Sequence, residues 1–206
     1  MDDQHERVRR GYDALADAYQ TSRADTLPDI EIVDRFVDAL PDGATVFDAG
    51  CGAGQPVTTA LREHGLDPVG LDISFEQVRL ARQNVPEGRF VQGDLTALPY
   101  HPAQFDAAVA FYSVIHVPRD RHGTVYGELH RVLTGGGLLL VTVGIEAWEG
   151  HNPDWLDTGV EMLWSFPSIE TSIDLLGDAG FTILDRCTVD DSLGGEYAML
   201  LVRAER

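Results

Sequence analysis

The sequence predicts an α/β protein built on a doubly wound, mostly parallel sheet with helices on both faces. Three observations lead to this class. Short apolar runs alternate along the chain with segments of helical period. The first run, residues 46–49, leads through Gly50, Gly52 and Gly54 into a helical stretch. A second run, residues 68–72, ends in a carboxylate. Two strand ends should therefore meet at one edge, where open α/β sheets bind ligands.

Two helices are expected before the first strand, within residues 1–43. Residues 4–20 carry apolar side chains at helical spacing, with Tyr12 and Tyr19 among the aromatic positions. The second helix is expected to begin at Pro28, because proline is favoured in the first turn of a helix.

The glycine loop after the first strand indicates the kind of ligand. Glycines at alternate positions let the backbone turn sharply and remove the side chains that would keep a ligand away. A dinucleotide-binding loop has a third glycine where Gln55 stands here. Asp48 also places a carboxylate near the expected position of a pyrophosphate. The loop therefore favours a ligand with an ammonium group over a dinucleotide.

The D-x-G-x-G-x-G pattern from Asp48 to Gly54 resembles motif I of the class I S-adenosylmethionine-dependent methyltransferases. The resemblance covers nearly the whole chain and points to a branch of small, mostly uncharacterised enzymes that act on small molecules. It implies a Rossmann-like sheet of seven strands, the last antiparallel, in a single domain over residues 1–206, and S-adenosylmethionine as cofactor. The cofactor-binding residues that it implies are Tyr12, Tyr19, Asp48, Gly50, Cys51, Gly52, Asp72, Ile73, Asp94, Leu95 and Phe111.

Spacing and resemblance agree at Asp72. It lies 18 positions beyond Gly54, near the roughly 20-residue interval at which a strand-end acid meets a ribose diol. A carboxylate can accept hydrogen bonds from both hydroxyls of the diol. The alternative is a loop acid that caps the next helix at Ser74. By resemblance, Asp94 accepts a hydrogen bond from the adenine amino group, and backbone carbonyls near Phe111 hold the ammonium group.

The rest of the chain is expected to continue the alternation of helices and strands. The expected elements are a helix over 55–64, a helix over 74–84, a strand over 89–94, a strand over 105–110 that continues to 117, a helix over 119–133, a turn over 134–137, a strand over 138–143, a helix over 168–179, and closing strands over 181–184 and 197–202. This order is typical of one doubly wound sheet.

Residues 144–167 interrupt the alternation. They hold all three tryptophans and five acidic residues but no arginine. Aromatic side chains outside a regular period predict an inserted cover over the crevice, which would form the acceptor side of the pocket and favour a neutral or cationic acceptor. Trp148, Trp164 and His116 are the expected substrate contacts. Packing in the core is the alternative for the tryptophans.

Methyl transfer requires alignment of donor and acceptor and exclusion of water, and an oxygen or nitrogen acceptor also has to lose a proton. His116, which follows the fourth strand, is the first choice for the base, and Tyr112 is the second. The alternative for both residues is packing. The spacing of His116, His122 and Cys187 is not that of a metal site, so no metal is expected.

The composition limits the partners. Thirty-four acidic residues stand against 15 basic ones, all arginine, which gives a formal net charge of -19. Such a surface repels nucleic acid, and no apolar run approaches the ~20 residues of a membrane span. Two cysteines form no disulfide framework, and a cytoplasmic setting is expected. The acidity fits either adaptation to salt or a GC-rich genome.

Three functions remain open at this stage. The first is a methyltransferase for a small-molecule acceptor, acting as a monomer or homodimer. The second is a protein that binds S-adenosylmethionine without catalysis, as a sensor or partner subunit. The third is an NAD-type oxidoreductase, which Gln55 and Asp48 disfavour.

Overall fold

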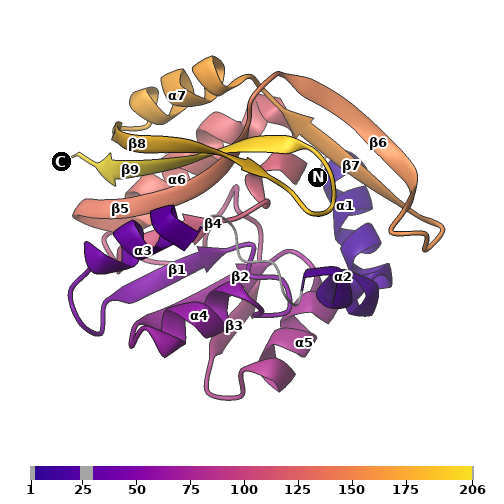
Figure 1. Ribbon diagram of the computed structural model, residues 1–206, viewed down its shortest axis with the longest axis horizontal. Helices are drawn as coiled ribbons and strands as arrows, with labels where there is room; N and C mark the ends of the chain where they lie inside the picture. Colours follow the sequence, from indigo (N-terminus) through magenta and orange to yellow (C-terminus); the bar gives the residue numbers. More distant parts are fainter. Residues whose placement is uncertain (1–2, 24–29, 206) are drawn as a thin grey trace.

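The computed structural model describes residues 3–23 and 30–205, and Pro28, where a helix was expected to begin, lies outside them. The main sheet has the strand order β3-β2-β1-β4-β5-β9-β8 (Figure 1). Its strands are β1 (Thr45–Ala49), β2 (Asp67–Asp72), β3 (Arg89–Gln92), β4 (Phe105–Ala110), β5 (Leu133–Gly144), β8 (Phe181–Asp190) and β9 (Glu196–Ala204). The helices are α1 (Asp3–Ala14), α2 (Ala16–Arg23), α3 (Ile30–Asp38), α4 (Val57–Glu63), α5 (Phe75–Asn84), α6 (His122–Val132) and α7 (Ile169–Asp178), with short 3-10 helices η1 (Val114–His116) and η2 (Arg119–Arg121).

The strand directions confirm the predicted fold class. The pairs β3-β2, β2-β1, β1-β4 and β4-β5 are parallel, whereas β9 runs antiparallel to both of its neighbours, β5 and β8. Because β1, β2 and β4 are parallel and adjacent, their carboxyl ends lie at one edge of the sheet. The glycine loop and Asp72 follow two of these ends.

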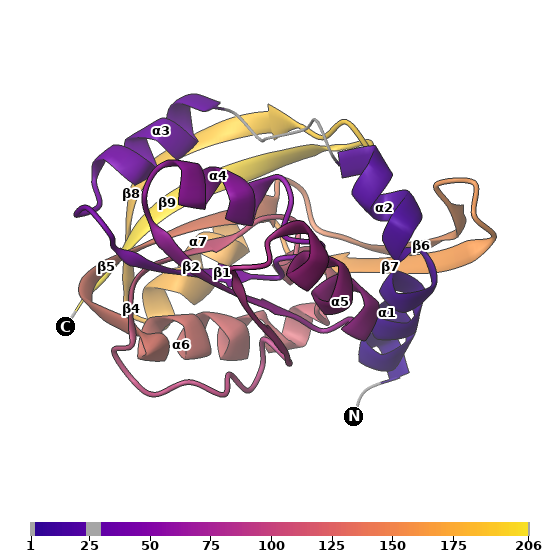
Figure 2. The ribbon, with the colours of Figure 1, turned by 90° about the horizontal axis from the view of Figure 1, so that it is seen from below.

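Helices cover both faces of the sheet (Figure 2). Successive side chains of β1 point to opposite faces, so both faces need a cover to bury them. Val46 packs in a cluster with residues of α3 and α4, and the next residue, Phe47, packs with residues of α6 and α7 on the opposite face. Both side chains are fully buried. A central strand buried on two sides reads as a continuous apolar run, which is why it was recognisable in the sequence.

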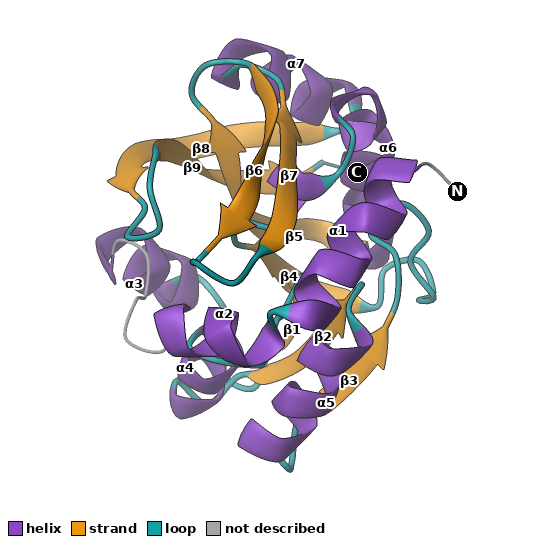
Figure 3. Cartoon of the chain, turned by 90° about the vertical axis from the view of Figure 1, so that its right-hand side faces the viewer, coloured by secondary structure: helices purple, strands orange, loops and turns teal. Residues whose placement is uncertain are grey.

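The sequence predicted an inserted cover over residues 144–167 but not its secondary structure. These residues contain a regular antiparallel hairpin, β6 (Trp148–Trp155) and β7 (Val160–Phe166), which forms a sheet of its own. Figure 3 shows the hairpin beside α1, and α1 and β7 are in contact. Most of β6 is exposed, so its sequence lacks the apolar alternation that identifies a strand. Its regularity comes from pairing with β7.

Three other predicted elements need correction. The helix over 4–20 is interrupted at Leu15, which separates α1 from α2. The fourth strand does not continue to residue 117, because it ends at Ala110 and the chain turns at Tyr112, where φ is +51°. Finally, residues 134–137 do not form a separate turn. They are an irregularity within β5, where the pairing register with β4 shifts.

None of the helices in residues 3–23 and 30–205 is long and apolar enough to cross a bilayer.

Candidate ligand-binding site

The glycine loop is fixed against the end of β2. The backbone N–H groups of Gly50 and Cys51 both donate to the carbonyl of Leu71, at 2.7 and 3.0 Å. Gly50 has φ +87°, and a Cβ there would lie 2.2 Å from the Cβ of Ser113. No other residue fits this position, because both the backbone conformation and the space require glycine. The Ser113 hydroxyl in turn donates to Ala49 O at 2.6 Å, so the turn after β4 closes over the end of β1.

The carboxylate of Asp72 joins the loop to the next helix. Its Oδ2 accepts from the Gly52 N–H at 2.9 Å, and its Oδ1 accepts from the Ser74 N–H at 2.8 Å. Burial raises the pKa of Asp72 to about 6, against the opposing effect of those two N–H groups. Each carboxylate oxygen can still accept another hydrogen bond. The structure thus shows the alternative, in which Asp72 supports the start of the helix at Ser74, and the ribose contact of Asp72 stays a prediction.

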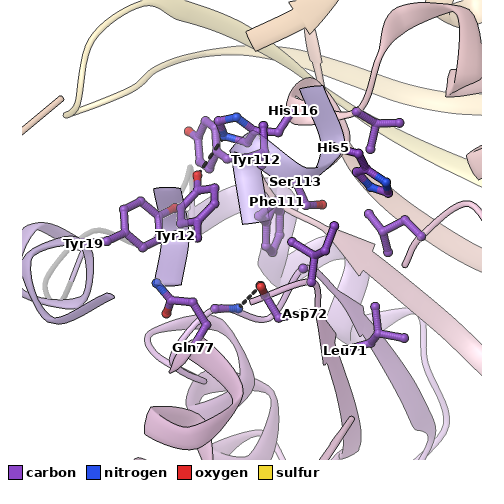
Figure 4. Close-up of a pocket in the computed structure, with 16 residues that line it drawn as sticks. His5, Tyr12, Tyr19, Leu71, Asp72, Gln77, Phe111, Tyr112, Ser113 and His116 are labelled. Carbon is purple, nitrogen blue, oxygen red and sulfur yellow. Dashed lines mark hydrogen bonds between the residues drawn. The ribbon is translucent and has the colours of Figure 1, made fainter. Parts of the chain in front are cut away.

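A cavity opens above this edge and is called the strand-end cavity (Figure 4). Its lining includes eight of the residues that the resemblance assigned to the cofactor, namely Tyr12, Tyr19, Gly50, Gly52, Asp72, Ile73, Leu95 and Phe111. The other lining residues are His5, Val8, Leu71, Gln77, Tyr112, Ser113, His116 and Val117. The elements that meet here are α1, α2, the strand ends and the turn after β4.

Helix α1 is held over the strand-end cavity by Asp13, a contact that the sequence did not indicate. The Asp13 carboxylate accepts from the Ser74 hydroxyl at 2.7 Å and from the Glu76 N–H at 3.2 Å. This places the neighbouring Tyr12 over the cavity, where its ring meets that of Tyr19 edge-on, with centroids 5.1 Å apart. An acid at the N-terminus of α5 also interacts favourably with the helix dipole.

A smaller inner pocket at the glycine loop is lined by six of the assigned residues, and two of these, Asp48 and Cys51, do not line the strand-end cavity. Asp48 is buried and accepts from the Thr58 hydroxyl at 2.6 Å, and burial raises its pKa to about 7. The Cys51 side chain packs with Val78, Ala81 and Phe90 in the core. A ligand at the glycine loop would therefore meet mainly the backbone atoms of Cys51.

Asp94 lies to one side of the strand-end cavity, in a pocket that it shares with His5. His5 Nδ1 is 3.3 Å from one carboxylate oxygen of Asp94. The other oxygen accepts from the backbone and hydroxyl of Thr96. The carboxylate is thus turned toward α1 in this structure.

A second cavity of about 360 Å³ lies between the β6-β7 hairpin and the turn joining β8 to β9, and is called the hairpin cavity. Its lining contains Trp148, Trp164 and His116, the three residues expected on the acceptor side. Of the remaining lining residues, the sequence analysis had named Tyr12 and Tyr112, and Asn152, Trp155 and Phe166 lie in the segment 144–167 that was expected on the acceptor side. The others are Arg23, Ile115, Asp191, Leu193, Gly194, Gly195, Glu196 and Tyr197.

Arg23 and Asp191 form a buried ion pair in the wall of the hairpin cavity. The guanidinium donates to both carboxylate oxygens, at 2.5 and 2.9 Å, and lies over the Tyr112 ring at 4.4 Å from its centroid. Burial opposes the charged form of Arg23, but Tyr19 and Asp191 hold its pKa above the ordinary value. The pair connects α2 to the β8-β9 turn. No local pattern in the sequence indicated this ion pair, because Arg23 and Asp191 are 168 positions apart.

His116 is buried with both ring nitrogens engaged. Nδ1 lies 2.7 Å from the carbonyl of Leu163 and Nε2 lies 2.8 Å from the Tyr12 hydroxyl. Because a carbonyl only accepts, Nδ1 donates its proton to Leu163 O and Nε2 accepts from Tyr12. Burial lowers the pKa of His116 to about 4, so the ring is neutral. Tyr12, Tyr112 and His116 line both the strand-end and the hairpin cavity and form a shared wall.

Within residues 3–23 and 30–205, no group of three or more His, Cys, Asp or Glu side chains is arranged to hold a metal ion.

Comparison with known proteins identifies relatives for the central part of the chain. Residues 46–137 match the family described as Methyltransferase domain. A tRNA (carboxymethyluridine(34)-5-O)-methyltransferase of Arabidopsis thaliana is 31% identical over 152 residues, which are 71% of this chain and 34% of that protein. A sterol 24-C-methyltransferase of Eremothecium gossypii is 29% identical over 191 residues, 81% of this chain and 50% of that protein. The chain thus spans about a third to a half of these relatives.

Solved structures share the whole fold. The magnesium protoporphyrin IX methyltransferase of Synechocystis PCC 6803, solved with bound SAH, has a TM-score of 0.75 and 19% identity, with 98% of this chain and 100% of that chain covered. At this identity the likeness concerns the fold, which extends beyond the segment that the family description matches.

Proposed function

The chain belongs to the class I S-adenosylmethionine-dependent methyltransferases, and from this premise we propose that it transfers the methyl group of S-adenosylmethionine to a small-molecule acceptor. One observation carries the proposal. Two cavities of different character meet at a shared wall of Tyr12, Tyr112 and His116. Group transfer needs two ligands to be held in contact, one on each side of such a wall.

The strand-end cavity suits the cofactor. A methyl group added to Gly52 would meet no side-chain atom closer than 3.7 Å, so the bare loop leaves space for a ligand against the backbone. Asp72 offers free acceptor capacity for a ribose, and Asp48 in the inner pocket offers a carboxylate for the ammonium end. When bound, S-adenosylmethionine supplies a methyl group on a positively charged sulfur. We propose the eleven residues of the resemblance for this role, with Cys51 acting through its backbone.

The hairpin cavity suits an acceptor with an apolar body. Seven aromatic residues line it, and its buried cation is already neutralised by Asp191. A pocket of this kind binds ring systems and orients them with a few polar groups. The named substrate of the sterol relative supports this class. A tRNA acceptor, named for the Arabidopsis relative, is disfavoured here by the net charge of -19.

The shared wall can remove a proton from the acceptor. The Tyr12 oxygen takes the proton of an acceptor O–H or N–H as the Tyr12 hydroxyl proton passes to Nε2 of His116. Leu163 O stabilises the resulting imidazolium through Nδ1–H. His116 is thus the base, acting through Tyr12 rather than on the acceptor itself. Tyr112 and the tryptophans exclude water from the reacting atoms.

We also propose the domain organisation, the cellular location and the oligomeric state of the protein. Residues 1–206 act as one domain, in which 1–43 contain the N-terminal helices and 144–167 cover the site. We assign the protein to the cytoplasm as a monomer or homodimer, without a nucleic-acid or membrane partner, because of its acidic surface and its cysteine content.

The test combines binding with turnover. Calorimetry should detect SAH binding and no comparable binding of NAD, and radiolabelled S-adenosylmethionine should transfer its methyl to a member of a panel of sterols, phenols and amines. Tight SAH binding without transfer to any of them would favour the non-catalytic alternative. Preferential binding of NAD would overturn the proposal.

A further inference from the structure

Seven aromatic residues line the hairpin cavity, and their rings form an unbroken series of contacts. Neighbouring ring centroids along the series are 5.3 to 5.9 Å apart. The rings come from α1, from both strands of the hairpin, from β9 and from the turn after β4. In order, the members of this aromatic series are Tyr12, Trp155, Trp164, Trp148, Phe166, Tyr197 and Tyr112. Because the faces of such rings carry partial negative charge, they attract cations as well as apolar groups.

Arg23 connects the two ends of the aromatic series and already lies against one of its rings. Its guanidinium is 4.4 Å from the centroid of Tyr112 and 5.6 Å from that of Tyr19, whose ring contacts Tyr12. The bidentate contact with Asp191 neutralises this cation. Arg23 therefore adds no net positive charge that would repel a second cation.

Glu196 gives the hairpin cavity its net charge. The residue begins β9, is exposed and lies in the lining of the cavity. Within residues 3–23 and 30–205, its carboxylate forms no ion pair. Arg23 and Asp191 cancel, and the buried His116 ring is neutral. The lining thus carries one negative charge, which a positive ligand would balance.

Trp148 lies at the mouth of the hairpin cavity. It contacts Trp164 and Phe166, yet 46% of its surface is exposed. A large aromatic side chain left open at the rim of a cavity indicates a surface that a ligand covers. The cavity therefore suits a ligand that presents a positive group to the rings and buries an apolar body among them.

Methyl transfer to nitrogen would bring positive charge into this cavity. The lone pair of the acceptor nitrogen forms a bond to the methyl carbon while the carbon–sulfur bond breaks and its electron pair stays on sulfur. The positive charge thus moves from sulfur to nitrogen. A tertiary amine loses no proton, whereas a primary or secondary amine passes one through Tyr12 to His116. An alcohol or phenol would give an uncharged product, for which Glu196 would have no counterpart.

We propose that the aromatic series and Glu196 form a cage for a cationic nitrogen, and that the acceptor is an aliphatic amine attached to an apolar body. This substrate class deepens the proposed function and rests on it. The rings and the carboxylate stabilise the charge that develops on nitrogen. They therefore favour the transition state and the product over the bound free amine.

The binding experiment compares two ligands of the same shape, para-hydroxybenzyl trimethylammonium and para-neopentylphenol, which differ in the positive nitrogen. Calorimetry on the SAH complex gives both affinities. Every tryptophan of the chain lines the hairpin cavity, so quenching of tryptophan fluorescence locates the bound ligand there. We expect the wild type to bind the ammonium ligand at least about tenfold more tightly than the uncharged one.

Two variants separate the ring from the charge. Trp148→Leu keeps an apolar side chain without the aromatic face, and Glu196→Gln keeps the shape without the charge. Each should lower the affinity for the ammonium ligand about fivefold and that for the uncharged ligand less than about twofold. Glu63→Gln is the control, because it removes one exposed charge on α4 outside the cavity and should bind both ligands as the wild type does.

The transfer experiment offers both acceptor atoms in one molecule, para-(dimethylaminomethyl)phenol. We expect its nitrogen to be methylated, which nuclear magnetic resonance distinguishes from methylation of its oxygen. Equal affinity of the wild type for the two ligands, no quenching by either, equal losses for both in the two variants, or methylation of the oxygen would overturn the inference. If the wild type fails to bind SAH, the proposed function fails. If it binds SAH and methylates phenols but no amine, only the present inference fails.

Discussion

The strand-end cavity and the hairpin cavity are built in different ways. The base of the first comes from one continuous stretch, from Gly50 to Asp72, and two neighbouring strands bring its ends together. The second draws Arg23, Trp164 and Asp191 from three distant parts of the chain. A site made by adjacent strands is set by the sheet, whereas a site made by loops and an added hairpin depends on contacts that form only after the sheet exists.

The shared wall gives the largest expected effect. His116→Ala removes the base, and we expect kcat for the acceptor found in the panel to fall about a hundredfold. The affinity for SAH should change by less than about threefold, because Asp72 and the glycine loop are untouched. Tyr12→Phe, which removes only the hydroxyl, should reproduce the loss of kcat. Parallel losses of SAH binding and kcat in both variants would show instead that the wall serves only the cofactor side.

Asp72→Ala tests the strand-end cavity alone. The loss of a charged acceptor for the ribose should weaken SAH binding about tenfold to a hundredfold, as measured by calorimetry. Asp72→Asn is a useful comparison, since its amide keeps one acceptor oxygen and should lose less. Unchanged SAH affinity in Asp72→Ala would remove the ribose assignment.

Trp164→Ala tests the hairpin cavity alone. The side chain is half-buried and packs against the rings of Trp155 and His116, at centroid distances of 5.3 and 5.4 Å. Removing this apolar wall should lower kcat/KM for the acceptor about tenfold to thirtyfold, mostly through KM. SAH affinity should be unaltered. Leu184→Ala, an exposed change on β8, is the control. A loss of SAH affinity equal to the loss of kcat/KM would mean that the two cavities are not separable.

The smallest effect concerns pH. An ammonium group binds the ionised form of Asp48, whose pKa is about 7 without ligand, so SAH affinity should fall about tenfold from pH 8 to pH 6. Asp48→Asn should bind SAH more weakly at pH 8 and keep only a slope of about twofold, which Asp72 contributes through its own pKa of about 6. The same raised pKa acts on folding with the opposite sign: in ligand-free protein it lowers the free energy of unfolding as pH rises from about 4 to about 7. If the SAH affinity of the wild type does not change between pH 8 and pH 6, the ammonium group does not bind at Asp48.

The contrast between the cavities also explains what the sequence could predict. The sheet and the strand-end positions were predictable because apolar runs, glycines and terminal acids are close in sequence and have local causes. The antiparallel direction of β9 was predicted only from the resemblance to the family. The hairpin was missed as a strand pair because β6 is mostly exposed and has no apolar alternation. Arg23–Asp191 and Asp13–Ser74 were missed because each depends on packing between separate elements.

The hairpin pairs only with itself and adds no strand to the main sheet. Substitutions in β6 therefore leave every ladder of the seven-stranded sheet in register. Leu163 and Ser165 of β7 are tied to the rest of the fold by hydrogen bonds to His116, Arg119 and His122. Glu161 of β7 also accepts from Arg7 of α1, and Glu149 of β6 forms an ion pair with Arg119. Under the proposed function, the acceptor side of the site can therefore be altered by substitutions in a single exposed strand, while the sheet and the strand-end cavity keep their structure.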